Sequence, residues 1–151
     1  MKLRLLLMMA MSLALGADAP KDDQASKALQ QFQGTWTLEH VEINGMKVDA
    51  QTMKQAGHEI TLIVRDDTFT LKLKRGAIQG TLELDPTKKP KAYNSKGTDP
   101  EGMAHEAVGI YKMDGDTLTV CAVAAGKDRP TEFKADAGSE AVVQVFKRNK
   151  K

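Results

Sequence analysis

Three consecutive segments between residues 60 and 84 alternate apolar and polar side chains with a period of two. Very short connections, Asp66-Asp67 and Arg75-Gly76, separate them. Alternation with one apolar face is typical of a strand that packs one side on a core, and connections this short join antiparallel neighbours. The apolar positions are Ile60, Leu62, Val64, Phe69, Leu71, Leu73, Ile78, Leu82 and Leu84. The sequence therefore predicts an antiparallel meander in the middle of the chain.

Further β-rich segments lie on both sides of this meander, at residues 35–43, 107–113, 117–123 and 141–148. The first of them ends at Asn44-Gly45, the strongest short hairpin signal. An open antiparallel sheet of about eight strands would leave two unpaired edges, and closure into a barrel removes both. The predicted fold class is therefore all-β, a single antiparallel up-and-down barrel of about eight strands with two short helices.

The alternation is broken in the first of these segments. Trp36 and Leu38 share one face, whereas Val41 and Ile43 share the other. A β-bulge near Glu39 or His40 would bring both pairs into the core, because a bulge inserts one extra residue and reverses the alternation.

Two segments carry helical patterns. Ala25, Ala28, Leu29 and Phe32 fall at the spacing of one helix face. A second short helix is expected at residues 49–57, with Asp49 as its N-cap. The expected organisation is a leader with a short helix at residues 20–33, a barrel domain at 34–148 and a basic tail at 149–151.

The first 19 residues differ in character from the rest of the chain. Lys2 and Arg4 precede an apolar stretch at residues 5–15, and small residues follow it. This is the layout of a secretory signal peptide, and the stretch is too short for a transmembrane helix. Residues 1–19 are expected to be the signal peptide, with cleavage after Ala19 or after Gly16, and an uncleaved anchor is the alternative. Export to the periplasm or the extracellular space follows, without stable membrane insertion after removal of the signal.

The charge balance and the motifs exclude several classes of function. With 22 Lys and Arg against 20 Asp and Glu, the chain lacks the basic excess of a dedicated nucleic-acid binder. Its one cysteine excludes an intramolecular disulfide and a cysteine-cluster zinc site. The three histidines are too far apart in the sequence to form a local metal-binding pair. With no nucleophile-elbow, phosphate-loop or zinc-protease motif, no catalytic residue, metal or cofactor is assigned, and the protein is not expected to be an enzyme.

The Gly-x-Trp motif of the first strand, Gly34-Thr35-Trp36, is preceded by a short helix, and Lys147-Arg148 ends the last strand. This combination resembles the lipocalin-like (calycin) barrels. The resemblance implies that Trp36 packs at the closed end of the barrel with Arg148 lying across it. Gly34, Trp36 and Arg148 are therefore the expected structural signature of the domain.

A second resemblance covers nearly the whole chain after the signal peptide. The order and spacing of several blocks resemble the small exported domains of unknown function that are abundant in Planctomycetes. The blocks are Gln33-Gly34-Thr35-Trp36, Leu84-Asp85-Pro86-Thr87-Lys88-Lys89-Pro90-Lys91, Gly109-Ile110-Tyr111, Asp114-Gly115-Asp116-Thr117-Leu118, Val120-Cys121 and Arg129-Pro130-Thr131-Glu132-Phe133. The resemblance implies export and a lipocalin-like barrel, and it implies no activity or ligand. Residues 92–102 are mostly polar and are expected to form either a poor strand or a mobile loop.

Barrels of about eight strands are either filled by their own side chains or hold one small ligand. The inner face is aliphatic and poor in aromatic rings, which favours a binding module for a small apolar molecule. The expected lining is Ile60, Leu62, Val64, Phe69, Leu71, Leu73, Ile78, Leu82, Leu84, Leu118 and Val120. The alternative is a structural or protein-interaction module with a filled barrel, and an enzyme of unknown type is the third hypothesis.

Overall fold

The structure is a computed structural model that describes residues 21–150. The predicted signal peptide lies outside the described residues. The elements in chain order are α1 (Lys21–Phe32), β1 (Gly34–Ile43), β2 (Met46–Asp49), α2 (Ala50–Gln55), β3 (Thr61–Arg65), β4 (Thr68–Leu73), β5 (Gly76–Asp85), β6 (Lys91–Thr98), β7 (Ala104–Asp114), β8 (Thr117–Ala124) and β9 (Val142–Arg148).

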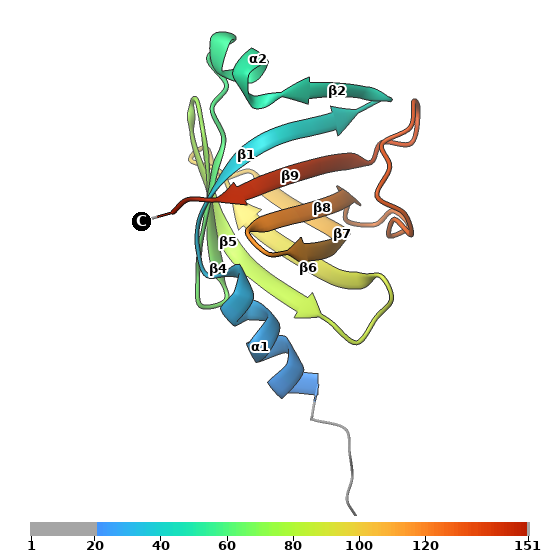
Figure 1. The fold of residues 1–151 in the computed structure, drawn as a ribbon. Coiled ribbons are helices and arrows are strands. Elements are labelled where there is room, and N and C mark those ends of the chain that lie inside the picture. Colours follow the sequence, from blue (N-terminus) through green and yellow to red (C-terminus); the bar gives the residue numbers. More distant parts are fainter. Residues whose placement is uncertain (1–20, 151) are drawn as a thin grey trace, which may run out of the picture.

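The strands form one antiparallel sheet in the order β2-β1-β3-β4-β5-β6-β7-β8-β9, and β1 also pairs with β9. This second pairing closes an eight-strand barrel and leaves β2 as a short flap on β1 (Figure 1). The predicted all-β, up-and-down barrel with two short helices is therefore confirmed. The segment at residues 92–102 contains a strand, since β6 pairs with β7 along its whole length and with β5 over residues 92–98.

Strand β1 changes its partners halfway along its length. Its first half pairs with β3 and its second half with β2, while β9 runs along its other edge. The pairing with β9 shifts register between Leu38 and His40, which confirms the predicted bulge. The bulge brings Val41 into the core, but the expectation for Ile43 was wrong, because Ile43 lies at the end of the strand and is exposed.

The turn after β1 has the geometry that its sequence predicts. Asn44 and Gly45 both have positive φ, at 52° and 75°. A two-residue hairpin turn of this kind requires positive φ at both central positions, which Asn and Gly tolerate best. The second predicted helix is also present, and the Asp49 side chain accepts a hydrogen bond of 2.7 Å from the Thr52 backbone N–H at its start.

The two ends of the barrel differ. One end carries α1, the turns β3–β4 and β7–β8, and the C-terminal end of β9. Trp36 is fully buried there, and its Nε1 donates a 2.9 Å hydrogen bond to the Phe32 carbonyl at the end of α1. Arg148 Cζ lies 4.1 Å from the centre of the Trp36 ring system, and its Nη atoms donate to the carbonyls of Gln31 and Gln33. The indole and the guanidinium thus satisfy carbonyls that the helix end leaves unpaired, and we call this end the base.

A second apolar cluster lies outside the barrel. Residues of β7, β8 and β9 that point away from the interior, among them Ile110, Cys121 and Val143, pack with Phe133, Ala135 and Ala141 of the long segment between β8 and β9. Arg129 from the same segment donates hydrogen bonds of 2.7 and 2.8 Å to the carbonyls of Tyr93 and Gly109. This wall of the barrel is therefore covered on its outer face, unlike the solvent-facing strands of the meander.

Candidate functional site

The interior of the barrel contains a cavity of about 100 Å³. Apolar side chains from α1 and five strands of the barrel make up most of its wall. The lining residues are Phe32, Leu62, Phe69, Leu71, Leu82, Tyr93, Ser95, Leu118, Val120, Gln144 and Phe146. A cavity of this size exceeds by several times the space needed for one water molecule.

The predicted lining residues fall into two groups. Those that line the cavity are Leu62, Phe69, Leu71, Leu82, Leu118 and Val120. The other five lie elsewhere. Val64 and Leu84 are buried in the core, with Ile78 packed against it. Ile60 lines a separate depression of about 230 Å³ between α2, strand β1 and residues 58–60, which precede β3. Leu73 is at the end of β4, is exposed, and does not line the cavity, because β4 ends at the open rim of the barrel.

Five lining residues were not predicted from the sequence. Phe32 is the last residue of α1 and closes the cavity from below, where its ring lies edge-on to Tyr111 at a centroid distance of 5.0 Å. Phe146 and Gln144 alternate on the inner face of β9, and Tyr93 and Ser95 alternate on β6. The period-two pattern extends to the four strand positions, but polar side chains at three of them, Tyr93, Ser95 and Gln144, hide the inner face from a search for apolar alternation.

Three of the lining side chains are polar, and the structure gives them no hydrogen-bond partner within residues 21–150. They are the phenol of Tyr93, the hydroxyl of Ser95 and the amide of Gln144. Burial is the main cause that raises the pKa of Tyr93 well above its ordinary value. Its phenol is therefore neutral and able to donate a hydrogen bond at physiological pH.

Small side chains face the interior on the neighbouring strands. The register pairs Tyr93 with Gly109 and Gly109 with Ala122, so all three share the inner face. A Cβ at Gly109 would lie 2.6 Å from Tyr93 Cε1, which shows that the Tyr93 ring lies against the glycine. Ala107 and Ala122 are half-buried although they face inward. The barrel is thus less completely filled on the β6–β8 wall than at its base.

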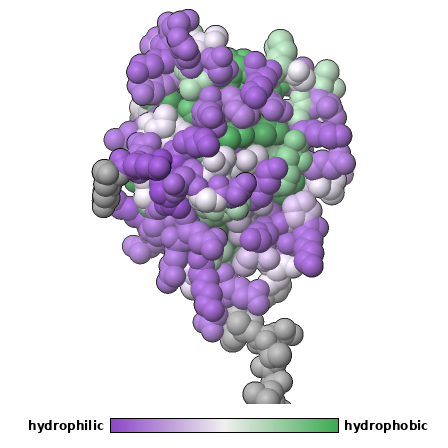
Figure 2. Space-filling view, in the orientation of Figure 1, coloured by the Kyte–Doolittle hydropathy of each residue, from purple (hydrophilic) through white to green (hydrophobic). Residues whose placement is uncertain are grey.

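The end of the barrel opposite the base carries an apolar rim. Ile43, Met46, Leu73 and Met103 are exposed to 43%, 65%, 38% and 63%, and all four lie where strands or connections end at this side. Figure 2 shows hydrophobic surface in the upper half of the molecule, towards the end with β2 and α2, and mostly hydrophilic residues below it. We call this end the mouth.

Titratable groups near the mouth form a structural cluster. His105 Nε2 lies 2.9 Å from Asp99 Oδ2, and the other oxygen of Asp99 accepts hydrogen bonds from the backbone N–H groups of Glu101 and Met103. The His105 contact and these bonds hold the pKa of Asp99 below its usual value. The four residues order the β6–β7 connection. Within the described part of the chain, no three His, Cys, Asp or Glu side chains gather in a way that could hold a metal ion.

Tyr111 lies below the cavity and provides a test of the packing around it. Its hydroxyl is buried without a hydrogen-bond partner among the described residues. Burial, with the Asp85 carboxylate as a second cause, raises the pKa of Tyr111 to about 12.

We expect Tyr111→Phe to raise the free energy of unfolding by about 1 kcal/mol at pH 7, because it removes an unsatisfied buried hydroxyl. The raised pKa means that the native state holds the phenolic proton more tightly than the unfolded state does. Stability is therefore lost as the pH rises from about 10, the pKa of tyrosine in the unfolded chain, through the pKa of Tyr111 in the folded protein. The variant should therefore lose less stability between pH 10 and pH 12 than the wild type. Urea unfolding at pH 7 and pH 11 measures both effects, and a destabilised variant at pH 7 would show that the hydroxyl is hydrogen-bonded.

No protein-family model matches this chain, and no curated protein matches its sequence. In the described residues no helix has the length and apolar character needed to cross a membrane. The functional argument therefore depends on the barrel and on the geometry of its interior.

Proposed function

We propose that the protein is an exported, lipocalin-like barrel that binds a small apolar molecule inside the barrel, entering at the mouth. The observation that supports this most strongly is a cavity whose wall is mostly apolar but includes three polar side chains without hydrogen-bond partners. Ligand sites typically combine apolar walls with a few convergent polar groups of this kind. The signal-peptide pattern at residues 1–19 and the resemblance to exported Planctomycetes-type domains support the same compartment and the same lipocalin-like class.

The size of the cavity limits the ligand. Pockets for drug-sized molecules usually measure about 300–1,000 Å³, whereas this cavity measures about 100 Å³. A ligand would place only a slender apolar part in the cavity, with the rest along the β6–β8 wall towards the mouth. The half-buried, inward-facing Ala107 and Ala122 leave room along that path.

The same small volume favours a second candidate function. A barrel filled by its own side chains would act through its outer surface, as a structural or protein-interaction module. The tightly filled base, where Trp36, Leu118 and Phe146 are almost completely buried, fits this alternative. The two functions differ in one measurable property, which is whether the interior takes up an apolar molecule.

Uptake is best measured with a small ligand at high concentration. Each buried CH₂ contributes about 0.8 kcal/mol, so a six-carbon chain provides roughly 4–5 kcal/mol. A Kd in the region of 1 mM corresponds to about 4 kcal/mol. We therefore choose 1-hexanol, titrated to millimolar concentrations, and follow the backbone amide signals of the full chain by NMR.

We expect saturable shifts at residues on the inner face, and we expect Ser95→Phe to weaken binding by about tenfold or more, because its ring would occupy the cavity. Lys96→Phe is the matched control, since Lys96 is the next residue on β6 and is exposed. It should bind 1-hexanol as the wild type does. Absence of saturable shifts, or equal binding by the Ser95→Phe variant, would support the filled barrel instead. Native mass spectrometry of gently purified protein provides an independent search for a bound molecule.

A further inference from the structure

We propose that the polar group of the ligand is uncharged: the interior selects a neutral amphiphile with a hydroxyl, carbonyl or amide group over a carboxylate, a phosphate or an amine of the same size. This inference rests on the proposed function and deepens it, because it names the chemical class that the cavity would accept. Two features of the cavity lie together and support the inference. Three neutral polar side chains in its wall have no hydrogen-bond partner, and none of its lining residues is charged.

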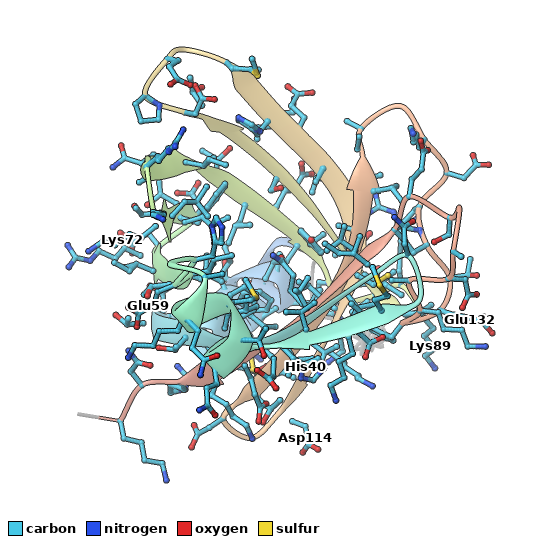
Figure 3. All side chains as sticks on the ribbon, turned by 90° about the horizontal axis from the view of Figure 1, so that it is seen from above. His40, Glu59, Lys72, Lys89, Asp114 and Glu132 are labelled. Carbon is cyan, nitrogen blue, oxygen red and sulfur yellow. The ribbon has the colours of Figure 1, made fainter. Side chains whose placement is uncertain are left out.

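The cavity lining contains no Asp, Glu, Lys, Arg or His. Charged side chains lie around the outside of the barrel, as the labelled Lys72, Lys89 and Glu132 show in Figure 3. Two arginines lie close to the barrel wall, and the hydrogen bonds of both are made to other groups. Arg148 is stacked on Trp36 and donates to Gln31, Gln33 and Asp116. Arg129, whose charge acts on the phenol of Tyr93, donates to the carbonyls of Tyr93 and Gly109 and to the Asn94 side chain.

An ionised group in this cavity would give up part of its hydration without gaining a counter-ion. Transfer of an isolated carboxylate or ammonium from water to an apolar interior is far more costly than transfer of a neutral polar group. The neutral group, in contrast, finds partners. A tyrosine or serine hydroxyl both donates and accepts hydrogen bonds, and a glutamine amide provides two donors and one acceptor.

The three polar groups come from two strands of the barrel. Tyr93 and Ser95 come from β6 and Gln144 from β9, and the two strands are separated by β7 and β8 in the barrel. The facing wall, formed by β3, β4 and β5, contributes Leu62, Leu71 and Leu82. Apolar side chains also lie beside the polar ones, since Leu82 pairs directly with Ser95 and Val120 with Gln144. The polar group of the ligand would therefore reach Tyr93, Ser95 or Gln144 while its hydrocarbon part contacts the apolar side chains next to them.

The test compares three ligands of six carbon atoms with different polar groups: 1-hexanol, hexanoate and hexylammonium. Each is titrated into the full chain at pH 7 and followed by NMR at the same inner-face amides. We expect 1-hexanol to bind about tenfold or more tightly than either ion, because the cavity offers no counter-ion. Hexanoate or hexylammonium that binds as tightly as the alcohol would overturn the inference and leave the proposed function intact. If none of the three binds, the proposed function itself fails.

Two near-isosteric variants examine the polar side chains directly. Gln144→Met and Tyr93→Phe keep the shape of the cavity and remove a hydrogen-bonding group. Each is expected to weaken 1-hexanol binding by about threefold or more, the effect of one lost hydrogen bond. Thermal unfolding identifies any variant that is not folded. Folded variants that both bind the alcohol as the wild type does would overturn the assigned role of these side chains, whereas hexanoate binding should stay weak in all of them.

Discussion

Trp36→Ala is expected to lower the free energy of unfolding by about 3–5 kcal/mol, the usual cost of truncating a fully buried tryptophan to alanine. A domain of this size has a total of about 5–15 kcal/mol, so the variant should be close to unfolding at 37 °C. Urea unfolding followed by circular dichroism measures the change.

The expected loss is large because Trp36 joins three parts of the base. Its ring is fully buried between the strands, its Nε1 donates to the Phe32 carbonyl of α1, and Arg148 stacks on its face. The cation–π contact alone contributes about 0.5–2 kcal/mol. Truncation therefore leaves a cavity at the base and also removes contacts of α1 and of the end of β9.

Trp36→Phe is the matched control. It keeps most of the buried apolar surface and a face for Arg148, and it loses the hydrogen bond to α1. We expect it to cost roughly 1–2 kcal/mol, within the usual range for a single buried substitution. An alanine variant as stable as the wild type would contradict the position of Trp36 in the core and, with it, the closed base on which the interior site depends.

The elements whose pattern is local were predictable from the sequence. The strands between residues 60 and 84 are predictable because one face is buried and the other is solvated, so apolar and polar residues alternate along each strand. The bulge in β1 is predictable because Trp36 and Val41 both require burial, although an even and an odd position of a regular strand face opposite sides of the sheet. The hairpin at Asn44-Gly45 was predicted because positive φ restricts the choice of residue.

Features that depend on distant segments were not predictable in the same way. The outer faces of β7, β8 and β9 are buried by the segment between β8 and β9, and a strand that is buried on both faces loses its alternation. The alternation after the bulge places Ile43 on the same face as Val41 and so predicts that it is buried. It lies at the mouth, however, where the barrel has no further layer to cover it.

The interior site was partly predictable for the same reason. The lining leucines of the meander follow from alternation, whereas Tyr93, Ser95 and Gln144 do not. In a sequence, a polar side chain on the inner face looks the same as one that faces solvent. Only the register of β6 between β5 and β7 shows that Tyr93 and Ser95 point inward. The residues that give the cavity its chemistry are thus the ones that a search for apolar periodicity passes over.

Gly80→Ala is expected to cost about 3 kcal/mol or more in the free energy of unfolding, at the upper end of the cost of overpacking. Gly80 pairs with Gly97 across β5 and β6. A Cβ at Gly80 would lie 1.8 Å from the Lys96 carbonyl oxygen and 2.5 Å from the Gly97 Cα. Both are backbone atoms, so the clash is relieved only if β6 moves away from β5. A glycine in a strand interior often marks such a close approach of two backbones.

Urea unfolding of Gly80→Ala is compared with that of Thr81→Val. Thr81 is the next residue on β5 and is exposed on the outer face, so this control should change stability by no more than about 0.5 kcal/mol. Displacement of β6 would also move Tyr93 and Ser95, and we therefore expect the alanine variant to show altered amide signals along both strands even where it remains folded. A Gly80→Ala protein with wild-type stability and an unchanged β6 spectrum would show that the two strands do not approach each other this closely at Gly80 and Gly97.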